Sequence, residues 1–208
     1  VQNLVALARS SALGLASPPE ALAYAAGVAV LGAASIAAAS AGRTSRLEGH
    51  IPFDWNSLLM VLAAGVMLFL PTLGDYGFYD PWEGHYAEVA RQMVWRDDWV
   101  SLYWENTWFW SKPVGIFWMM AVPFKAFGYS DLIARLPFAL TGLAGMLFVY
   151  YFCRKLWSAR AGVIAAIVLG TIPQYLFISR QVMTDVPVVV LTVIGIGCLI
   201  LALFAKED

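Results

Sequence analysis

The sequence predicts an all-α polytopic membrane protein with about five transmembrane helices and a large external loop that contains juxtamembrane helices. Of its 208 residues, 61% are hydrophobic and 13% are charged, whereas about 25% of the residues of an ordinary soluble domain are charged. The apolar residues also gather into five uncharged runs, each close to the roughly 20 residues that a helix needs to cross a bilayer. These runs are residues 21–42, 55–74, 136–153, 161–179 and 186–205.

The composition excludes some classes of function. A net charge of −1 provides no basic surface for nucleic acid. The two cysteines, Cys153 and Cys198, lie in or beside apolar runs, where a thiol acts as a packing residue rather than as part of a disulfide framework or a metal site. A transporter is disfavoured because ion and proton pathways place charged residues at mid-membrane, and the five runs contain none.

Basic residues in the short loops predict the orientation of the helices. Residues 153–160 carry three basic side chains and no acid, other basic residues lie between the first two runs, and Lys206 follows the last run. The positive-inside rule places all three segments in the cytoplasm. This requires that residues 113–124, a short apolar stretch with two prolines, form an interfacial or re-entrant helix rather than a span. Residues 75–135 and 180–185 are then external.

Two segments are expected along the chain. Residues 1–54 are predicted to form an extra N-terminal hydrophobic helix and a cytoplasmic loop, and residues 55–208 the main membrane domain with the external loop 75–135. The chain begins with Val rather than Met and stops directly after a hydrophobic run. We therefore expect it to be a piece of a longer protein, or a partly processed chain.

The external loop concentrates aromatic and acidic residues. Seven of the nine tryptophans lie between Trp82 and Trp118, and tryptophan prefers the membrane–water interface. An aromatic belt alone explains the tryptophans but not the acids beside them. Eight of the 14 acids lie in this loop: Asp75, Asp80, Glu83, Glu88, Asp97, Asp98, Glu105 and Asp131. We expect the loop to fold onto the membrane surface.

The segment Asp80-Pro81-Trp82-Glu83 has two compatible interpretations. Asp is a good N-cap, Pro suits the first helical position, and Glu three residues after the cap fits a capping box. A helix is therefore predicted from about Pro81 to Arg96. Its apolar stripe would consist of Trp82, Tyr86, Val89 and Met93. In the functional interpretation, the start of this helix directs carboxylates at a substrate on the membrane.

Three further charged residues are candidates. Lys112 follows the aromatic residues 108–110 and is either a snorkelling lysine or a point charge for a lipid phosphate. Arg180 and Asp185 lie at the external end of a span, where they form an interfacial pair or where Asp185 caps the next helix. The predicted orientation places Asp185 on the same side as Asp80 and Glu83, so acids from two loops could converge on one cleft.

Four motifs carry a resemblance to a known family. The segment Asp80-Pro81-Trp82-Glu83-Gly84-His85-Tyr86-Ala87-Glu88-Val89-Ala90-Arg91-Gln92-Met93 resembles the first external-loop motif of GT-C glycosyltransferases, and most of all that of bacterial aminoarabinose transferases and the related protein mannosyltransferases. Three motifs follow in family order: Ser111-Lys112-Pro113, Ala134-Arg135-Leu136-Pro137 and Met183-Thr184-Asp185-Val186-Pro187. The resemblance covers residues 75–205, so residues 55–208 would be the N-terminal part of a GT-C-like domain.

The resemblance implies an enzyme of the inner or plasma membrane. It would transfer a sugar from a polyprenyl-phosphate carrier to a lipid or protein acceptor on the non-cytoplasmic face. Asp80 or Glu83 would act as the first catalytic acid, Asp185 as the second, and Lys112 would bind the carrier phosphate. A carboxylate can deprotonate the acceptor hydroxyl, and a cation can stabilise the leaving phosphate. Four more residues would bind phosphate or substrate: Arg180, Arg91, His85 and Tyr86.

Departures from the family pattern leave some roles open. The family often places Asp directly before Glu, but here Pro81 and Trp82 separate Asp80 from Glu83, so either acid could be the base. Ser111 stands where relatives have a Glu that helps to hold a metal. No residue is therefore assigned as a metal ligand, although a divalent metal stays open as a cofactor. The alternative to an enzyme is a non-catalytic GT-C-like subunit or scaffold of a larger membrane complex, with membrane lipids and other subunits as partners.

Overall fold

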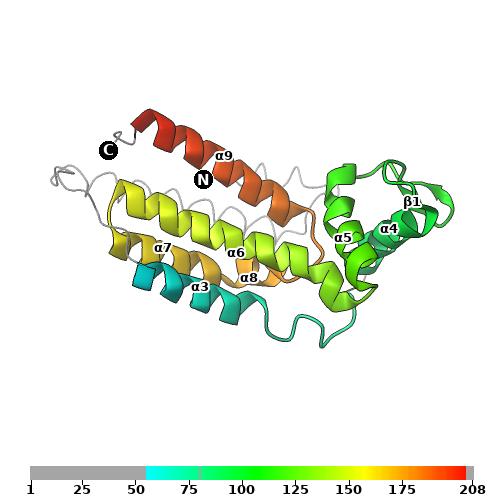
Figure 1. Ribbon diagram of the computed structural model, residues 1–208, viewed down its shortest axis with the longest axis horizontal. Helices are drawn as coiled ribbons and strands as arrows, with labels where there is room; N and C mark the ends of the chain where they lie inside the picture. The colour runs from blue at the N-terminus through cyan, green and yellow to red at the C-terminus, as the bar shows by residue number, and fades with distance from the viewer. Residues whose placement is uncertain (1–54, 80, 205–208) are drawn as a thin grey trace, which may run out of the picture. The chain divides into compact units, whose positions relative to one another are not determined.

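The computed structural model describes residues 55–79 and 81–204, all within one compact unit, His50–Asp208 (Figure 1). The predicted run 21–42 and the predicted segment 1–54 lie outside the described residues. In chain order the elements are α3 (Trp55–Phe69), α4 (Trp82–Arg96), β1 (Tyr103–Trp104), β2 (Thr107–Trp108), α5 (Val114–Phe127), α6 (Asp131–Leu156), α7 (Ala159–Thr171), α8 (Pro173–Ser179) and α9 (Asp185–Phe204).

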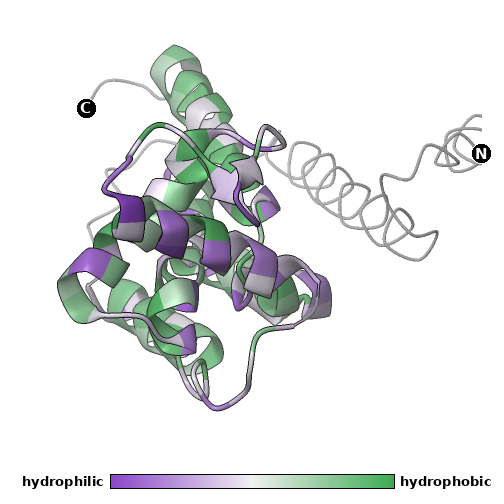
Figure 2. Ribbon diagram, turned by 90° about the vertical axis from the view of Figure 1, so that its right-hand side faces the viewer, coloured by the Kyte–Doolittle hydropathy of each residue, from purple (hydrophilic) through white to green (hydrophobic). Residues whose placement is uncertain are grey.

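Helix α6 is the central element of the described unit. It contacts α3, α5, α7, α8 and α9. In Figure 1, helices α3, α6, α7 and α9 lie alongside one another, and α4, α5 and the β hairpin occupy one end of this layer. One cluster of buried apolar residues joins α4, α5 and the start of α6, and another joins α3, α6 and α7. Seen from the α4 end, hydrophilic and hydrophobic residues alternate along the elements (Figure 2), as expected for helices that bury one face.

The helices agree with the prediction of a polytopic membrane protein. Among the described residues, two helical segments are long and apolar enough to cross a membrane: α6 and the part Asp185–Leu203 of α9. Helices α7 and α8 form a third candidate, although they are bent by 69° where they meet. Helices α3 and α5 are apolar but shorter, with 15 and 14 residues. The predicted number of five spans, and the interfacial position predicted for α5, stay predictions.

The predicted run 161–179 is not one helix. It breaks at Ile172, whose backbone is extended with φ −61° and ψ 118°. The cause is Pro173, because a proline has no N–H to donate and its ring disfavours the helical conformation of the residue before it. The first residue of α8 is therefore the proline itself, a position where its fixed φ is compatible with a helix.

Helix α6 begins before the predicted apolar run 136–153. It starts at Asp131, and the Ser130 hydroxyl caps it by accepting from Ile133 N at 3.2 Å. Its first turns therefore include charged residues, and the predicted external loop 75–135 stays a prediction. The all-α prediction also missed the antiparallel pair β1–β2. Its two turn residues, Glu105 and Asn106, have φ 47° and 63°, the left-handed conformation that a type I′ hairpin turn requires.

The predicted range of α4 is confirmed, but the predicted capping by Asp80 and Glu83 is not. The helix spans Trp82–Arg96 against a predicted range of about Pro81 to Arg96, although Pro81 occupies the N-cap position without a side-chain hydrogen bond. Three members of the predicted apolar stripe, Tyr86, Val89 and Met93, are buried. The fourth is not, because Trp82 is 53% exposed.

Close packing between α6 and α8 yields a first testable prediction. A Cβ on Gly142 would lie 2.6 Å from Ser179 Cβ and 2.7 Å from its Oγ. Gly142→Ala should therefore lower the free energy of unfolding by about 1–3 kcal/mol, the usual cost of overpacking. The measurement is thermal unfolding in detergent, followed by circular dichroism.

The matched control is Gly195→Ala in α9, where a Cβ meets no atom within 4 Å. This variant should unfold at the wild-type temperature or slightly above it, since Ala is favoured over Gly in a helix. Equal unfolding temperatures for the two variants would contradict the close approach of α6 to α8.

Candidate functional site

The centre of the candidate site is a buried ion pair between α4 and α6. The Glu83 side chain is 1% exposed and the Arg135 side chain 0%. Arg135 Nε donates to Glu83 Oε1 at 2.9 Å, and Arg135 Nη2 donates to Glu83 Oε2 at 2.7 Å. Two parallel charge-assisted hydrogen bonds of this kind are the strongest geometry that a guanidinium and a carboxylate can adopt.

The remaining donors of Arg135 hold the segment that leads into α4. Nη1 donates to Leu73 O at 3.0 Å and to Tyr76 O at 2.7 Å, and Nη2 donates to Gly77 O at 2.8 Å. The Tyr76 ring also lies 4.0 Å from the guanidinium carbon. A guanidinium has five N–H donors, and each of the five has an acceptor here. The buried charge therefore has a complete set of partners.

The acceptors of Glu83 are equally complete. Its carboxylate also accepts from Tyr79 N at 2.7 Å and from Val182 N at 2.8 Å. A carboxylate offers about four lone-pair positions, and these bonds occupy them all. Glu83 was predicted as a possible catalytic acid, but this geometry favours an anchoring role, because no lone pair remains to accept a proton from a substrate.

Sequence reasoning did not select Arg135 as a site residue, although it lay in one of the four motifs. A usable signal existed, since an arginine within one turn of a long apolar run is expensive unless it has a buried acidic partner. That partner is 52 positions away in the sequence, and no periodicity indicates a pairing over such a distance.

The other two predicted catalytic acids are Asp80 and Asp185. Asp80 lies outside the described residues. Asp185 is exposed and begins α9, where it accepts a weak hydrogen bond from the Thr184 hydroxyl at 3.4 Å. The loop before it contacts α4 directly, through the bond from Val182 N to Glu83. Burial raises the pKa of Tyr86, and the negative charge of Asp185 raises it further. The structure thus brings together the start of α9 and the first turns of α4.

The predicted basic residues differ in how many protein groups they bind. Arg180 Nη2 donates to Pro71 O at 2.6 Å and to Thr72 Oγ1 at 2.8 Å, so it binds the turn that follows α3. Arg91 is paired on the exposed side of α4 with Glu88, at 2.6 Å. These contacts show two arginines engaged with protein groups, and their predicted roles in binding phosphate or substrate stay predictions.

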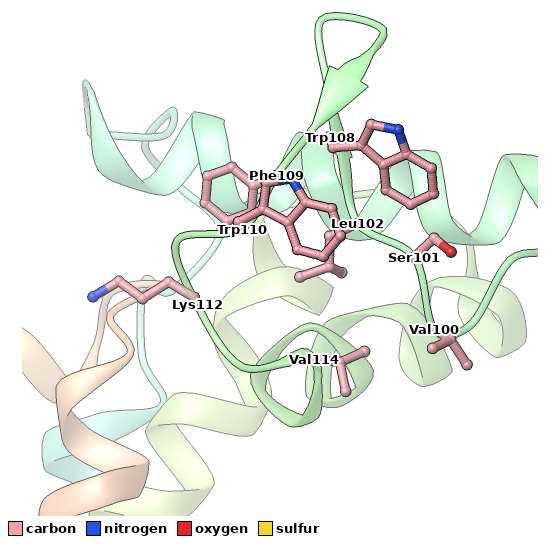
Figure 3. A pocket seen from close by; sticks show the side chains of 8 residues that line it. All are labelled: Val100, Ser101, Leu102, Trp108, Phe109, Trp110, Lys112 and Val114. Carbon is pink, nitrogen blue, oxygen red and sulfur yellow. The ribbon is translucent and has the colours of Figure 1, made fainter.

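Lys112 is half-buried and lines a pocket of about 290 Å³. In the part of the chain that the structure describes, its ammonium has no hydrogen-bond or ion-pair partner. Figure 3 shows the ammonium end pointing away from the three aromatic side chains that it labels. The other residues that line the pocket are Val100, Ser101, Leu102, Trp108, Phe109, Trp110 and Val114.

His85 is packed between aromatic rings. Its imidazole stacks on the Trp104 ring at 3.9 Å and 8°, and the Phe109 ring lies 4.9 Å away. Its Nε2 is buried without a hydrogen-bond partner among the described residues. Burial lowers the pKa of His85, and the charge of Glu105 acts in the opposite direction. Across residues 55–79 and 81–204, no group of three or more His, Cys, Asp or Glu side chains could hold a metal ion.

Comparisons with known proteins show what this chain is similar to. The profile of the dolichyl-phosphate-mannose-protein mannosyltransferase family matches residues 111–207. Two curated relatives are undecaprenyl phosphate-alpha-4-amino-4-deoxy-L-arabinose arabinosyl transferases. The enzyme of Pseudomonas fluorescens (strain Pf0-1) is 28% identical over 102 residues, which are 49% of this chain and 19% of that protein. The enzyme of Pseudomonas aeruginosa (strain LESB58) is 29% identical over 99 residues, which are 48% of this chain and 18% of that protein.

Two solved structures have the same fold. Both are of ArnT from Cupriavidus metallidurans, one bound to undecaprenyl phosphate and one in the apo state, with TM-scores of 0.68 and 0.66. Each is 22% identical in sequence, and the match covers 74% of this chain and 28% of that chain. Over the matched part, the chain therefore has the fold of these two ArnT structures.

The predicted resemblance is confirmed: the chain is a relative of the polyprenyl-phosphate-sugar-dependent GT-C glycosyltransferases and corresponds to an N-terminal part of them. It spans about a fifth of the length of the curated relatives that it matches.

The buried pair yields a second prediction. Breaking a buried ion pair by removing one partner costs about 3–5 kcal/mol, because the other charge stays buried alone. Arg135→Met and Glu83→Gln should each lower the unfolding temperature strongly, because each leaves the other charge buried alone. In the double variant Glu83→Leu, Arg135→Met, no charge is left unpaired, so it should be more stable than either single variant.

The matched control is Arg91→Ala, which removes an exposed ion pair from the same helix and should cost at most about 1 kcal/mol. If Arg135→Met unfolds at the temperature of Arg91→Ala, the buried pair does not hold α4 to α6.

His85 yields a third prediction. Because burial lowers its pKa from the ordinary value of 6.5, the unfolded chain binds a proton at a higher pH than the folded protein does. Folding stability should therefore fall as the pH drops through about 6.5. His85→Phe keeps an aromatic ring for the stack but cannot titrate, so its unfolding temperature should fall less between pH 7 and pH 5.5, roughly the titration range of histidine. Equal losses in the two proteins would contradict the lowered pKa.

Proposed function

We propose that this protein is an integral membrane glycosyltransferase that moves a sugar from a polyprenyl-phosphate carrier to a lipid or protein acceptor. The active face would be the non-cytoplasmic face of the inner or plasma membrane. The observation that carries the proposal is the buried node of Glu83, Arg135 and Val182, which fixes the first external helix against the loop before α9. The fold shared with ArnT bound to undecaprenyl phosphate supports it.

Because all acceptor positions of Glu83 are occupied, we assign the catalytic roles to other residues. We assign Glu83 to positioning, and Asp185, which is exposed, to accepting the proton of the acceptor hydroxyl. Asp80, which precedes α4, is the second candidate for that base. Lys112, whose ammonium has no partner in the described part of the chain, would bind the carrier phosphate. Tyr86, His85, Arg91 and Arg180 would line or support the donor site.

The reaction needs few groups. The acceptor oxygen attacks the anomeric carbon, the bond from that carbon to the phosphate oxygen breaks, and the hydroxyl proton passes to a carboxylate. The phosphate leaves with its negative charge next to a lysine, whose positive charge stabilises the transition state. Aromatic rings such as Trp108 and Trp110, which line the pocket beside Lys112, would cover the apolar chain of the carrier.

A second function is favoured by one observation. Because every lone pair of Glu83 is already used, the node is also what a non-catalytic GT-C-like subunit would need in order to hold its fold. Such a subunit would act as a scaffold in a larger membrane complex and would contact other membrane subunits.

The experiment that separates the two functions is our fourth prediction. Asp185→Asn should lower kcat by about 10²–10⁴-fold if this carboxylate takes the proton. Lys112→Met should lower kcat by about 10²–10³-fold if the ammonium stabilises the leaving phosphate. The assay measures transfer of labelled sugar from undecaprenyl-phosphate-linked donors to lipid and protein, in membrane vesicles that contain the full-length protein.

The control is Asp75→Asn, which removes an exposed acid of the same external loop and should leave the rate unchanged. If the wild-type protein transfers sugar and both Asp185→Asn and Lys112→Met match its rate with intact protein, the assigned roles are wrong. If no donor supports transfer by the wild type, the scaffold function replaces the enzymatic one.

A further inference from the structure

Trp82 is exposed at a position where its helix is otherwise well packed. It is the first residue of α4, and 53% of its surface is accessible, whereas Tyr86, four positions later on the same helix face, is 6% exposed. Single exposed aromatic residues are common and need no explanation. What distinguishes Trp82 is how firmly it is held and what lies beside it.

The position of Trp82 is fixed from two sides. Its neighbour in the chain, Glu83, is bound by the four hydrogen bonds of the buried node. Its ring stacks on the Tyr86 ring with centroids 6.4 Å apart and an angle of 26°. Tyr86 is itself wedged by an edge contact with Phe117 at 6.1 Å. An aromatic ring supported in this way is preorganised, so a ligand that stacks on it does not have to order it first.

The loop that leads to Asp185 meets the start of α4, because Val182 N donates to Glu83, the residue that follows Trp82. Burial raises the pKa of the Tyr86 phenol, and the negative charge of Asp185 acts in the same direction. Asp185 is exposed and accepts only one weak bond, from the Thr184 hydroxyl. A flat apolar face beside a few polar groups suits a ligand that has both an apolar face and hydroxyl groups.

We infer that Trp82, supported by Tyr86, is a stacking platform for the ring of the transferred sugar. This inference rests on the proposed function and deepens it, because it makes Trp82 a specificity-determining residue. A pyranose presents C–H groups on its faces and hydroxyl groups around its rim, which matches this arrangement. The carrier lipid has no such ring, so the platform distinguishes a loaded carrier from an empty one.

The competing role for Trp82 is an anchor in the membrane interface, where tryptophan is enriched. Helix α4 offers a matched control for that role in Trp95, which is 70% exposed and lies near the other end of the same helix. Trp95 contacts the Arg96 guanidinium at 5.9 Å and is remote in sequence from the buried node. An anchoring effect should appear at both tryptophans, and a stacking effect only at Trp82.

The kinetic test, our fifth prediction, compares Trp82→Phe, Trp82→Leu and Trp95→Leu in the full-length protein, with undecaprenyl-phosphate-linked hexoses and pentoses as donors. Stacking is worth about 0.5–1.5 kcal/mol, so Trp82→Leu should raise the donor KM by about 3- to 10-fold, since a factor of ten corresponds to about 1.4 kcal/mol. Trp82→Phe keeps a flat ring and should be close to wild type, and Trp95→Leu should be unchanged. A Trp82→Leu variant with the wild-type KM would overturn the inference.

A binding test does not depend on activity. Tryptophan fluorescence of the wild type and of Trp82→Phe is measured while undecaprenyl phosphate, with or without an attached sugar, is added. The loaded carrier should quench the wild type more than the variant, and the bare carrier should quench both equally. A difference that appears with the bare carrier too would identify a lipid anchor and overturn the platform. Loss of transfer with sugar-dependent quenching intact would count against the proposed enzyme but not against the platform.

Discussion

The structure depends on one buried ion pair. A carboxylate and a guanidinium that are removed from water each lose roughly several kcal/mol of hydration free energy. Their mutual attraction offsets this loss only when further hydrogen bonds satisfy the remaining donors and acceptors of both groups. Glu83 and Arg135 meet this condition, since five donors and four acceptor positions are all used. The pair joins four segments that are distant in sequence: residues 73–79, α4, α6 and the loop before α9. The external helices therefore have a fixed position relative to the apolar ones.

The sequence predicted what depends on local chemistry. The range of α4 was predicted correctly, although its N-cap makes no side-chain hydrogen bond, and the long apolar helices α6 and α9 follow from their hydropathy. The break before Pro173 has a local cause as well, and the hydrophobic run concealed it because all its residues are uncharged. The hairpin β1–β2 has only two residues in each strand. Its turn, Glu-Asn, lacks the glycine that usually marks a type I′ turn.

The candidate site was predicted as a set of residues but not as a set of contacts. Orientation and motifs put Glu83 and the loop of Asp185 on one side, and the bond from Val182 N to Glu83 joins those two segments. The sequence did not reveal that Arg135 and Arg180 are bound to backbone carbonyls. In such contacts the two partners are separated by roughly 60 to 110 positions in the sequence. The entropy cost of closing a loop changes slowly with its length, so sequence separation alone does not favour one partner over another.

Charged residues in this unit differ in how much of their bonding capacity is used, and that difference separates anchors from working groups. A group that must bind a substrate or move a proton needs a free lone pair or a free donor. Glu83 and Arg135 have none to spare, whereas Lys112 has no partner in the described part of the chain and Asp185 has one weak bond. Arg180 is intermediate in this respect, because its Nη2 donates two hydrogen bonds and its Nη1 donates only a weak one, at 3.4 Å. We therefore expect the chemistry proposed for this site to use the groups with unused bonding capacity, and we expect substitution at the saturated pair to affect that chemistry only through their positions.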